Sequence, residues 1–336
     1  MPTIRDVAKV AGVSPMTVSR AINRSGPVSE ETRARVEAAV EELGYVPNRL
    51  ASSLRSDKTD LVALILSDMT NTFWVEVMRG IEDALTKHGL YVILGNSDDS
   101  VVKEEDLLSS LAERRVDGFI LRPADTQGRA VELAQSYGIP IVVLDYAMPD
   151  VKVDVVRGDS VGGAYQLTKL LLDLGHRRIA ILTGAQRASP ATMRVAGYRR
   201  ALEEAGVAVD SALIYYDGFT LEGGYRMAVQ ALALHPRPTA LLTANNRISF
   251  GALRALRDAG LRIPQDISVV GFDELPVETA EHPFLTVAEQ SPHNMGCRAA
   301  ELLLSRIAGQ GPPAPQEIVL PTKVVFRQSC GPVPNA

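Results

Sequence analysis

Hydrophobic patterning divides the chain into two parts. Over roughly the first 45 residues the apolar positions recur with a helical period, whereas from Leu61 onward short apolar runs alternate with amphipathic stretches. Strand-helix alternation is typical of parallel sheets that are covered on both faces. We therefore expect an all-α head followed by an α/β body.

Signals at the helix ends predict a helix-turn-helix in the head. Thr3-Ile4-Arg5-Asp6 is a capping box, and Gly12 favours a left-handed stop. Ser14 is a natural N-cap, with Pro15 as the first helical residue. The turn between the two helices is short and contains glycine, as a helix-turn-helix requires.

The second helix has an outward face suited to DNA. Val18, Ala21 and Ile22 fall at i, i+3 and i+4 and should face inward. The residues predicted to contact DNA from this helix are Pro15, Met16, Thr17, Ser19, Arg20 and Asn23. Arginine can pair with guanine edges, while small hydroxyls and methionine can touch base edges or thymine methyl groups. A solvated surface arginine is the alternative, which we disfavour after such a turn.

A third helix, begun by Ser29 and ended by Gly44, completes the head. The helical piece after Asn48 is shorter than the ~12 residues that an isolated helix needs in water. Its apolar face, with Leu50 and Leu54, has nothing local to cover it. Two interpretations stay open: a linker, or a segment that orders when two copies meet on DNA.

In the body, seven apolar runs predict buried strands. They are LVALIL, YVILGN, GFILRP and IPIVVLD in the first half, and IAILTG, TALLTAN and ISVVGFD in the second. Helices are expected between them, for example over Val75–His88, Leu167–Leu174 and Ser249–Ala259. Two units of similar plan predict two Rossmann-like lobes hinged about a cleft.

Polar residues at strand ends predict a ligand site, because ligands in such sheets bind beyond the carboxyl ends of the strands. Asp145, Asn245 and Asp273 end apolar runs, and Arg194 follows the loop after IAILTG. Carboxylates and amides bind paired sugar hydroxyls, and a fixed arginine can donate to several oxygens. Each Asp or Asn could instead be a cap or turn residue. Four convergent polar groups favour a pocket.

Charge and cysteine content narrow the function classes. Residues 1–55 carry a net charge of +2 and the remainder −7, which suits a small nucleic-acid reader on an acidic body; a surface fluctuation is the alternative. The two cysteines, Cys297 and Cys330, show no metal-ligand spacing. We expect no metal, no cofactor, no secretory signal and no membrane segment, and a reducing cytosol as the compartment.

The head resembles that of the LacI/GalR family of bacterial transcription regulators. The motifs that carry the resemblance are TIRDVA (3–8), GVS (12–14), TVSR (17–20), VS (28–29), LGY (43–45), PN (47–48) and Leu54. The similarity continues along essentially the whole chain. It implies that the second helix enters the major groove, with Pro15 and Met16 setting operator choice. It also implies that Leu54 of the hinge, beside Ala51, wedges into the minor groove.

For the body, the resemblance implies a fold like that of periplasmic sugar-binding proteins. The positions that match family effector contacts are Asp145, Arg194, Asn245 and Asp273, then Asn71, Phe73 and Trp74 in the loop after the first strand, and Phe219 from the second lobe. Aromatic rings favour a sugar C–H face or a planar base. Trp74 is the only tryptophan, and a core position is the alternative for it.

Four positions depart from the family pattern. Asn246 replaces a frequent aspartate, Ser160 a frequent asparagine, Thr72 a frequent proline, and Thr192 a frequent arginine. These departures indicate either an unusual effector or a bearing on lobe closure.

We expect a DNA-binding domain over 1–46, a hinge helix and linker over 47–60, and an effector-binding and dimerisation domain over 61–336. One lobe comprises 61–158 with about 290–320. The other comprises 159–289 with about 321–330.

The leading hypothesis is a repressor that binds a pseudo-palindromic operator in double-stranded DNA as a homodimer. A small-molecule effector in the cleft controls it, either as inducer or as corepressor. Sugars and sugar acids lead as effectors, with purine-like ligands behind them. The tail shows no leucine heptad, so a dimer is favoured over a tetramer.

Two other classes explain the chain less well. A solute-binding protein of a transport system would explain the body but not the head. An enzyme is disfavoured, because the chain has no Walker loop, no GxGxxG after a strand, no HExxH and no GxSxG elbow.

Overall fold

The computed structural model describes residues 2–46, 58–275 and 283–333. By its internal contacts the chain forms two compact units, Met1–Thr59 and Asp60–Ala336. The only regular elements in the described part of the first unit are α-helices, whereas the second unit contains two lobes, each built on a mainly parallel sheet. The predicted fold class is therefore confirmed.

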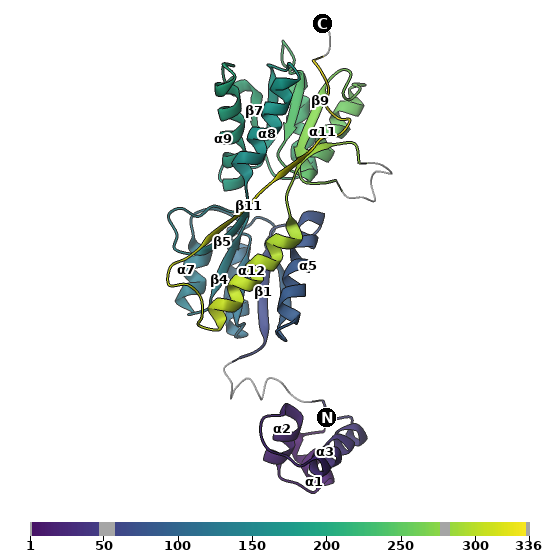
Figure 1. The fold of residues 1–336 in the computed structure, drawn as a ribbon, viewed down its shortest axis with the longest axis vertical. Coiled ribbons are helices and arrows are strands. Elements are labelled where there is room, and N and C mark those ends of the chain that lie inside the picture. The colour runs from purple at the N-terminus through teal and green to yellow at the C-terminus, as the bar shows by residue number, and fades with distance from the viewer. Residues whose placement is uncertain (1, 47–57, 276–282, 334–336) are drawn as a thin grey trace. The chain divides into compact units, whose positions relative to one another are not determined.

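The head consists of α1 (Ile4–Ala11), α2 (Pro15–Asn23) and α3 (Glu30–Leu43) (Figure 1). Its core is small, and Val7, Val18 and Val36 from the three helices are fully buried in it. The predicted caps are present. Asp6 accepts hydrogen bonds from the Thr3 N–H and hydroxyl groups at 2.8 and 2.7 Å, which lowers its pKa.

The first lobe of the body contains a six-stranded, wholly parallel sheet in the order β11-β5-β4-β3-β1-β2. Its strands are β1 (Leu61–Leu66), β2 (Tyr91–Asn96), β3 (Gly118–Leu121), β4 (Ile141–Leu144), β5 (Asp154–Gly158) and β11 (Glu317–Leu320). Helices α5 (Thr72–Thr86) and α12 (Pro292–Ile307) cover one face, and α6 (Val101–Glu113) and α7 (Arg129–Ser136) cover the other.

The second lobe contains another six-stranded sheet, in the order β12-β10-β9-β8-β6-β7. Its strands are β6 (Ile179–Thr183), β7 (Ile214–Tyr216), β8 (Ala240–Thr243), β9 (Ser268–Phe272), β10 (Thr286–Glu289) and β12 (Lys323–Val325). Helices α8 (Ser160–Asp173) and α9 (Ser189–Glu204) cover one face, and α10 (Leu221–Leu232) and α11 (Asn246–Asp258) the other. A 3-10 turn (Ser211–Leu213) precedes β7. The sheet is not wholly parallel, because β12 returns antiparallel to β10.

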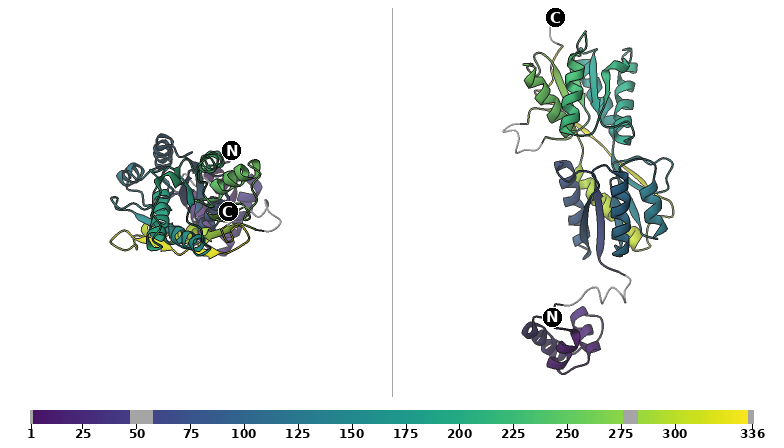
Figure 2. Two further views of the ribbon diagram at one scale, coloured as in Figure 1. Left: turned by 90° about the horizontal axis from the view of Figure 1, so that it is seen from above. Right: turned by 180° about the vertical axis from the view of Figure 1, so that it is seen from behind.

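The chain passes between the lobes three times: after β5, after β10, and between β11 and β12 (Figures 1 and 2). Each lobe is consequently built from segments distant in sequence. Three chain segments therefore connect the two lobes. None of the helices in the described ranges is long and apolar enough to cross a membrane.

Three helices begin earlier than their apolar patterns predicted. They start at Thr72, Ser160 and Asn246 rather than at Val75, Leu167 and Ser249. The reason is capping: the preceding side chains of Asn71, Asp159 and Asn245 each accept a backbone N–H of the first turn.

Candidate functional site

The outward face of α2 is accessible, as predicted. Pro15, Met16, Arg20 and Asn23 are exposed. Thr17 and Ser19 are half-buried at the edge of this face. The Ser14 hydroxyl accepts the Thr17 N–H at 3.1 Å, which fixes the entry into the helix. The helix therefore presents a methionine, an arginine and an amide to solvent from a rigid core. Ala51 and Leu54, predicted to read the minor groove, lie outside the described residues.

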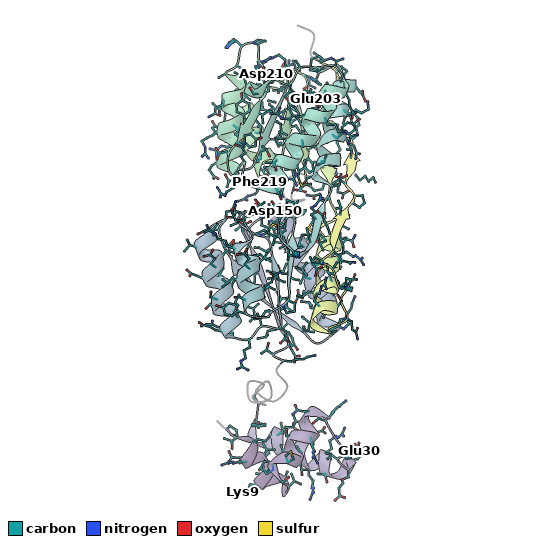
Figure 3. The ribbon with its side chains drawn as sticks, turned by 90° about the vertical axis from the view of Figure 1, so that its left-hand side faces the viewer. Lys9, Glu30, Asp150, Glu203, Asp210 and Phe219 are labelled. Carbon is teal, nitrogen blue, oxygen red and sulfur yellow. The ribbon has the colours of Figure 1, made fainter. Side chains whose placement is uncertain are left out.

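A cavity of about 260 Å³ lies between the two lobes of the body. All eight residues predicted for the effector line it: Asn71, Phe73, Trp74, Asp145, Arg194, Phe219, Asn245 and Asp273. Further lining residues, which were not predicted from the sequence, are Ser67, Asp68, Asp98, Asp99, Arg122, Thr220 and Gln290. Figure 3 shows Phe219 on the side of the second lobe that meets the first. The structure thus collects side chains from widely separated segments at one place.

Asp145 and Asp273 occupy equivalent positions at the carboxyl ends of β4 and β9. Their φ angles, 63° and 65°, lie in the left-handed region that non-glycine residues rarely adopt. Each backbone N–H still bonds to the neighbouring strand, at Val156 O and Ala288 O. Such strained backbone is characteristic of functional sites, where surrounding structure maintains it.

Asn71 and Asn245 serve both as helix caps and as cavity walls. The side-chain oxygen of Asn71, Oδ1, accepts the Phe73 N–H at 3.0 Å, and Oδ1 of Asn245 accepts the Ile248 N–H at 2.8 Å. The capping role considered for such residues is therefore real. Because capping uses the carbonyl oxygen, the Nδ2 group is the donor that each can offer to a ligand.

Arg194 projects from α9 and is buried. Its Nη1 donates to the Ala244 carbonyl, and its guanidinium lies 4.2 Å from the centre of the Phe272 ring. The guanidinium also lies 6.0 Å from the centre of the Phe219 ring. The guanidinium is thereby fixed, as a residue that orients a ligand must be.

Arg122 is the most informative residue that sequence reasoning missed. It follows β3, is buried, pairs with Asp99 and stacks on the Tyr146 ring at 4.7 Å. Burial acts to lower the pKa of Arg122, but Tyr146, Asp99 and Asp145 beside the guanidinium outweigh this effect and hold the pKa above its usual value. A charged residue directly after the apolar GFIL run was the available signal, by the same rule that identified Asp145.

Phe73 and Trp74 lie in the first turn of α5 rather than in a loop. Their rings meet edge-to-face with centroids 5.0 Å apart. Both are buried in the hydrophobic core of the first lobe and also line the cavity. For Trp74 the core and ligand-wall interpretations are consequently compatible.

The cavity is polar and rich in carboxylates. Five aspartates and two arginines line it. Burial raises the pKa of Asp273 to about 6, against the opposing effects of Arg194 and of the hydrogen bond from Gln290. Four buried atoms of the lining have no partner within the described structure: Arg122 Nε, Arg194 Nε, Asp145 Oδ1 and Gln290 Oε1.

The two lobes also touch directly around the cavity. The Ala147 N–H donates to the Ser189 hydroxyl at 2.9 Å. Asn246 Nδ2 donates to Asn71 Oδ1, also at 2.9 Å. Arg247 approaches Asp68 and Thr70 at longer range. No cluster of three or more His, Cys, Asp or Glu side chains that could hold a metal occurs among the residues whose placement is described.

Comparison with known proteins extends over both units. A family model for bacterial regulatory proteins of the lacI family matches residues 3–48, and one for periplasmic binding proteins and the sugar binding domain of the LacI family matches residues 59–327. The chain is 36% identical over 309 residues to the ribose operon repressor of Escherichia coli (strain K12), covering 91% of this chain and 93% of the relative. It is 34% identical over 308 residues to the HTH-type transcriptional repressor PurR of Photobacterium profundum, covering 91% and 92%. Its structure is similar to that of the lac repressor dimer bound to operator and the anti-inducer ONPF, with a TM-score of 0.86, 29% identity and 98% coverage of each chain.

Proposed function

The chain belongs to the LacI family of bacterial regulatory proteins, and on this premise we propose that an uncharged sugar or polyol in its cavity controls DNA binding by its head. The protein is a DNA-binding transcriptional repressor under allosteric control by a small molecule. The relatives are operon and purine repressors, and the lac repressor structure holds operator and a small ligand. The lining of the cavity supports the chemical class of the effector.

The observation that carries this proposal is the set of four buried atoms without partners. Two of them, Arg122 Nε and Arg194 Nε, are donors. The other two, Asp145 Oδ1 and Gln290 Oε1, are acceptors. A hydroxyl group both donates and accepts, so a ligand with several hydroxyls can supply partners of both kinds. A buried polar group without a partner costs about 1–3 kcal/mol, so satisfying these atoms favours binding.

The charge balance favours an uncharged ligand over a sugar acid. The cavity has three more aspartates than arginines. Arg122 pairs with Asp99, and Lys103 and Arg247, outside the lining, pair with Asp98 and Asp68. This leaves Asp145 and Asp273 against Arg194. A carboxylate or phosphate on the ligand would meet this negative excess at short range. The volume of about 260 Å³ lies near the lower end of the ~300–1,000 Å³ typical of ligand pockets, which suits a monosaccharide.

A purine-like corepressor is the second candidate. The purine repressor among the relatives motivates it, and Phe73, Trp74 and Phe219 could stack on a planar base. The two ligand classes differ in the placement of their polar groups. A purine base has its donors and acceptors in the plane of the ring, whereas each sugar hydroxyl both donates and accepts, so a sugar can meet lining atoms that lie in different directions.

On the DNA side, we propose that α2 lies in the major groove, with Met16 and Arg20 reading base edges. Two chains form a dimer that binds two half-sites of a pseudo-palindromic operator. The hinge, which we assign to residues 47–60, places Ala51 and Leu54 at the minor groove. The bacterial cytoplasm, where the DNA lies, is the proposed compartment, and the proposed role involves no catalysis.

Calorimetric titration of the full chain tests the effector class. The panel is D-ribose, D-glucose, D-xylose, ribitol, D-gluconate, ribose 5-phosphate and hypoxanthine. We expect saturable binding of a neutral sugar or polyol and none of the two anions. Binding of D-gluconate, ribose 5-phosphate or hypoxanthine alone would refute the proposed class.

Selection of bound fragments from a bacterial genomic DNA library tests the DNA side. The recovered fragments should share an inverted repeat. Arg20→Ala should reduce affinity for it about 5- to 150-fold, because each bidentate base contact is worth about 1–3 kcal/mol. Arg35→Ala, an exposed arginine on α3, is the matched control and should retain sequence selectivity. Sedimentation at tetramer mass would contradict the dimer.

A further inference from the structure

A buried pair of asparagines joins the two lobes beside the cavity. Asn71 precedes α5 in the first lobe, and Asn246 is the first residue of α11 in the second. Asn246 Nδ2 donates to Asn71 Oδ1 at 2.9 Å. Asn246 is only 2% exposed and Asn71 only 6%. This hydrogen bond is therefore shielded from water.

The direction of the bond is fixed by local chemistry. Asn71 Oδ1 also accepts the Phe73 N–H at 3.0 Å, and only the carbonyl oxygen of an amide can accept. Asn71 cannot turn its amide around without losing the cap of α5. Residue 246 must therefore be a donor for the contact to exist. The aspartate frequent at this position in the family could not supply one when ionised.

Other contacts at this edge are weaker. Arg247 Nη2 lies 3.4 Å from Thr70 Oγ1, and Arg247 Nε lies 3.8 Å from Asp68 Oδ2. The ion pair is about one-third exposed on each side. Exposed pairs of this kind contribute little, so they add only weakly to closure. The amide pair is consequently the specific element of this contact.

We propose that Asn246 is a positioning residue that holds the lobes closed over the cavity through Asn71. Because Asn246 and Phe73 both use Asn71 Oδ1, the pair also leaves Asn71 Nδ2 as the group offered to a ligand. Lobe closure and the geometry of the binding wall are thereby coupled in one side chain. The inference rests on the proposed function only in taking the cavity as the effector site, and its test needs no effector.

Pulsed electron-electron double resonance measures the separation of the lobes directly. Cysteines that carry spin labels replace Lys87 and Glu203, exposed in the first and second lobes, in the full chain after Cys297 and Cys330 are changed to serine. Labelled chains are diluted with unlabelled ones to suppress distances between subunits. The variants are Asn246→Asp, which changes the donor to an acceptor of the same shape; Asn71→Asp, which keeps both acceptor functions; and Arg247→Gln as the neighbouring control.

We expect the chain with both asparagines unaltered, Asn71→Asp and Arg247→Gln to give mainly the shorter label-to-label distance, that of the closed lobes. Asn246→Asp should raise the ratio of open to closed molecules about fivefold, as for loss of one neutral hydrogen bond. The melting temperature of each variant is measured alongside to separate lobe opening from unfolding, because a carboxylate buried at residue 246 costs stability although an acid in the first turn of α11 is favourable for the helix.

Several results would overturn the inference. One is a distance distribution for Asn246→Asp that matches the unaltered chain. Another is a chain that is already mainly open with both asparagines present. Opening by Asn71→Asp or Arg247→Gln to the same extent would assign closure to other contacts. If Asn246→Asp does not fold, Asn246→Ser, which is too short to bridge the lobes, must give the open distance instead. The distance measurements need no effector, so they can be interpreted even if no compound of the calorimetric panel binds.

Discussion

Asp273 combines burial, strained backbone and a cavity position in one carboxyl group. Its pKa of about 6 lies above the 3.8 of an unperturbed aspartate because burial disfavours the charge. Between these values the folded protein binds more protons than the unfolded chain. This group therefore contributes most to stability below about pH 4, and that contribution is lost as the pH rises through about 6.

Asp273→Asn should raise the melting temperature of the ligand-free protein at about pH 7.5, because it removes a buried charge. The amide oxygen can still accept the hydrogen bond from Gln290. Calorimetry at about pH 5 and about pH 7.5 measures the melting temperatures of the unaltered protein and of Asp273→Asn. The gain should shrink at the lower pH. A variant that melts below the unaltered protein at the higher pH would contradict this assignment.

The same substitution should weaken effector binding. A carboxylate accepts ligand hydroxyls more strongly than an amide does, and charged hydrogen bonds contribute about 1.5–3 kcal/mol. We expect a loss in affinity of tenfold or more, and in the unaltered protein a decline in affinity as the pH falls below about 6. Isothermal titration across this pH range measures both. An affinity independent of pH would show that Asp273 does not accept from the ligand.

Individual site residues differ in how far the sequence could reveal them. Asp145, Asn245 and Asp273 follow apolar runs, so the strand-end rule finds them, and it would also have found Arg122. Gln290 follows β10, whose sequence TVAE (286–289) has a polar residue at each end and forms no apolar run. Asp98 and Asp99 reach the cavity through left-handed backbone after β2. Tertiary structure alone places such residues.

At the scale of elements, paired helices meet through glycines. A Cβ atom at Gly80 of α5 would overlap the His293 carbonyl oxygen of α12, and one at Gly296 of α12 would overlap that of Val77. Gly197, Gly224 and Gly251 make similar approaches in the second lobe. Apolar periodicity predicted helices here but not their close contact, because glycine contributes nothing to a hydrophobic stripe.

Gly80→Ala should destabilise the protein although alanine is the better helix former by about 1 kcal/mol. The added methyl group forces α5 away from α12, and overpacking of this kind costs about 1–3 kcal/mol. Chemical denaturation measures the free energy of unfolding. Glu82→Ala, exposed on the same helix, should change it by less than about 0.5 kcal/mol. Equal effects from both variants would argue against close helix packing.

At the scale of the whole molecule, three chain crossings connect two six-stranded sheets of similar plan (Figure 1). The cavity lies between the two lobes. Strand-helix alternation along the sequence predicted two lobes with a cleft. It missed the antiparallel return of β12, because Lys323–Val325 is too short to show a direction. Because the chain is an allosterically controlled repressor, ligand binding in the cavity must change the affinity of the head for DNA.

DNA binding should depend steeply on salt. The basic excess of the head indicates phosphate contacts, and each contact releases counterions. The logarithm of the affinity should fall linearly with the logarithm of the salt concentration, both for the selected fragment and for unrelated DNA. Fluorescence anisotropy at several potassium chloride concentrations measures this. A salt-independent affinity would exclude a phosphate-contacting head.

Operator affinity with and without the bound effector tests whether the cavity controls DNA binding. Fluorescence anisotropy of the selected fragment is measured for the full chain, with the sugar or polyol identified by calorimetry absent and then saturating. Allosteric coupling of ~1–3 kcal/mol predicts a ~5–150-fold change in the dissociation constant. Asp273→Asn should shift the response to higher ligand concentration without abolishing DNA binding. An operator affinity unchanged by a ligand that demonstrably occupies the cavity would contradict the account.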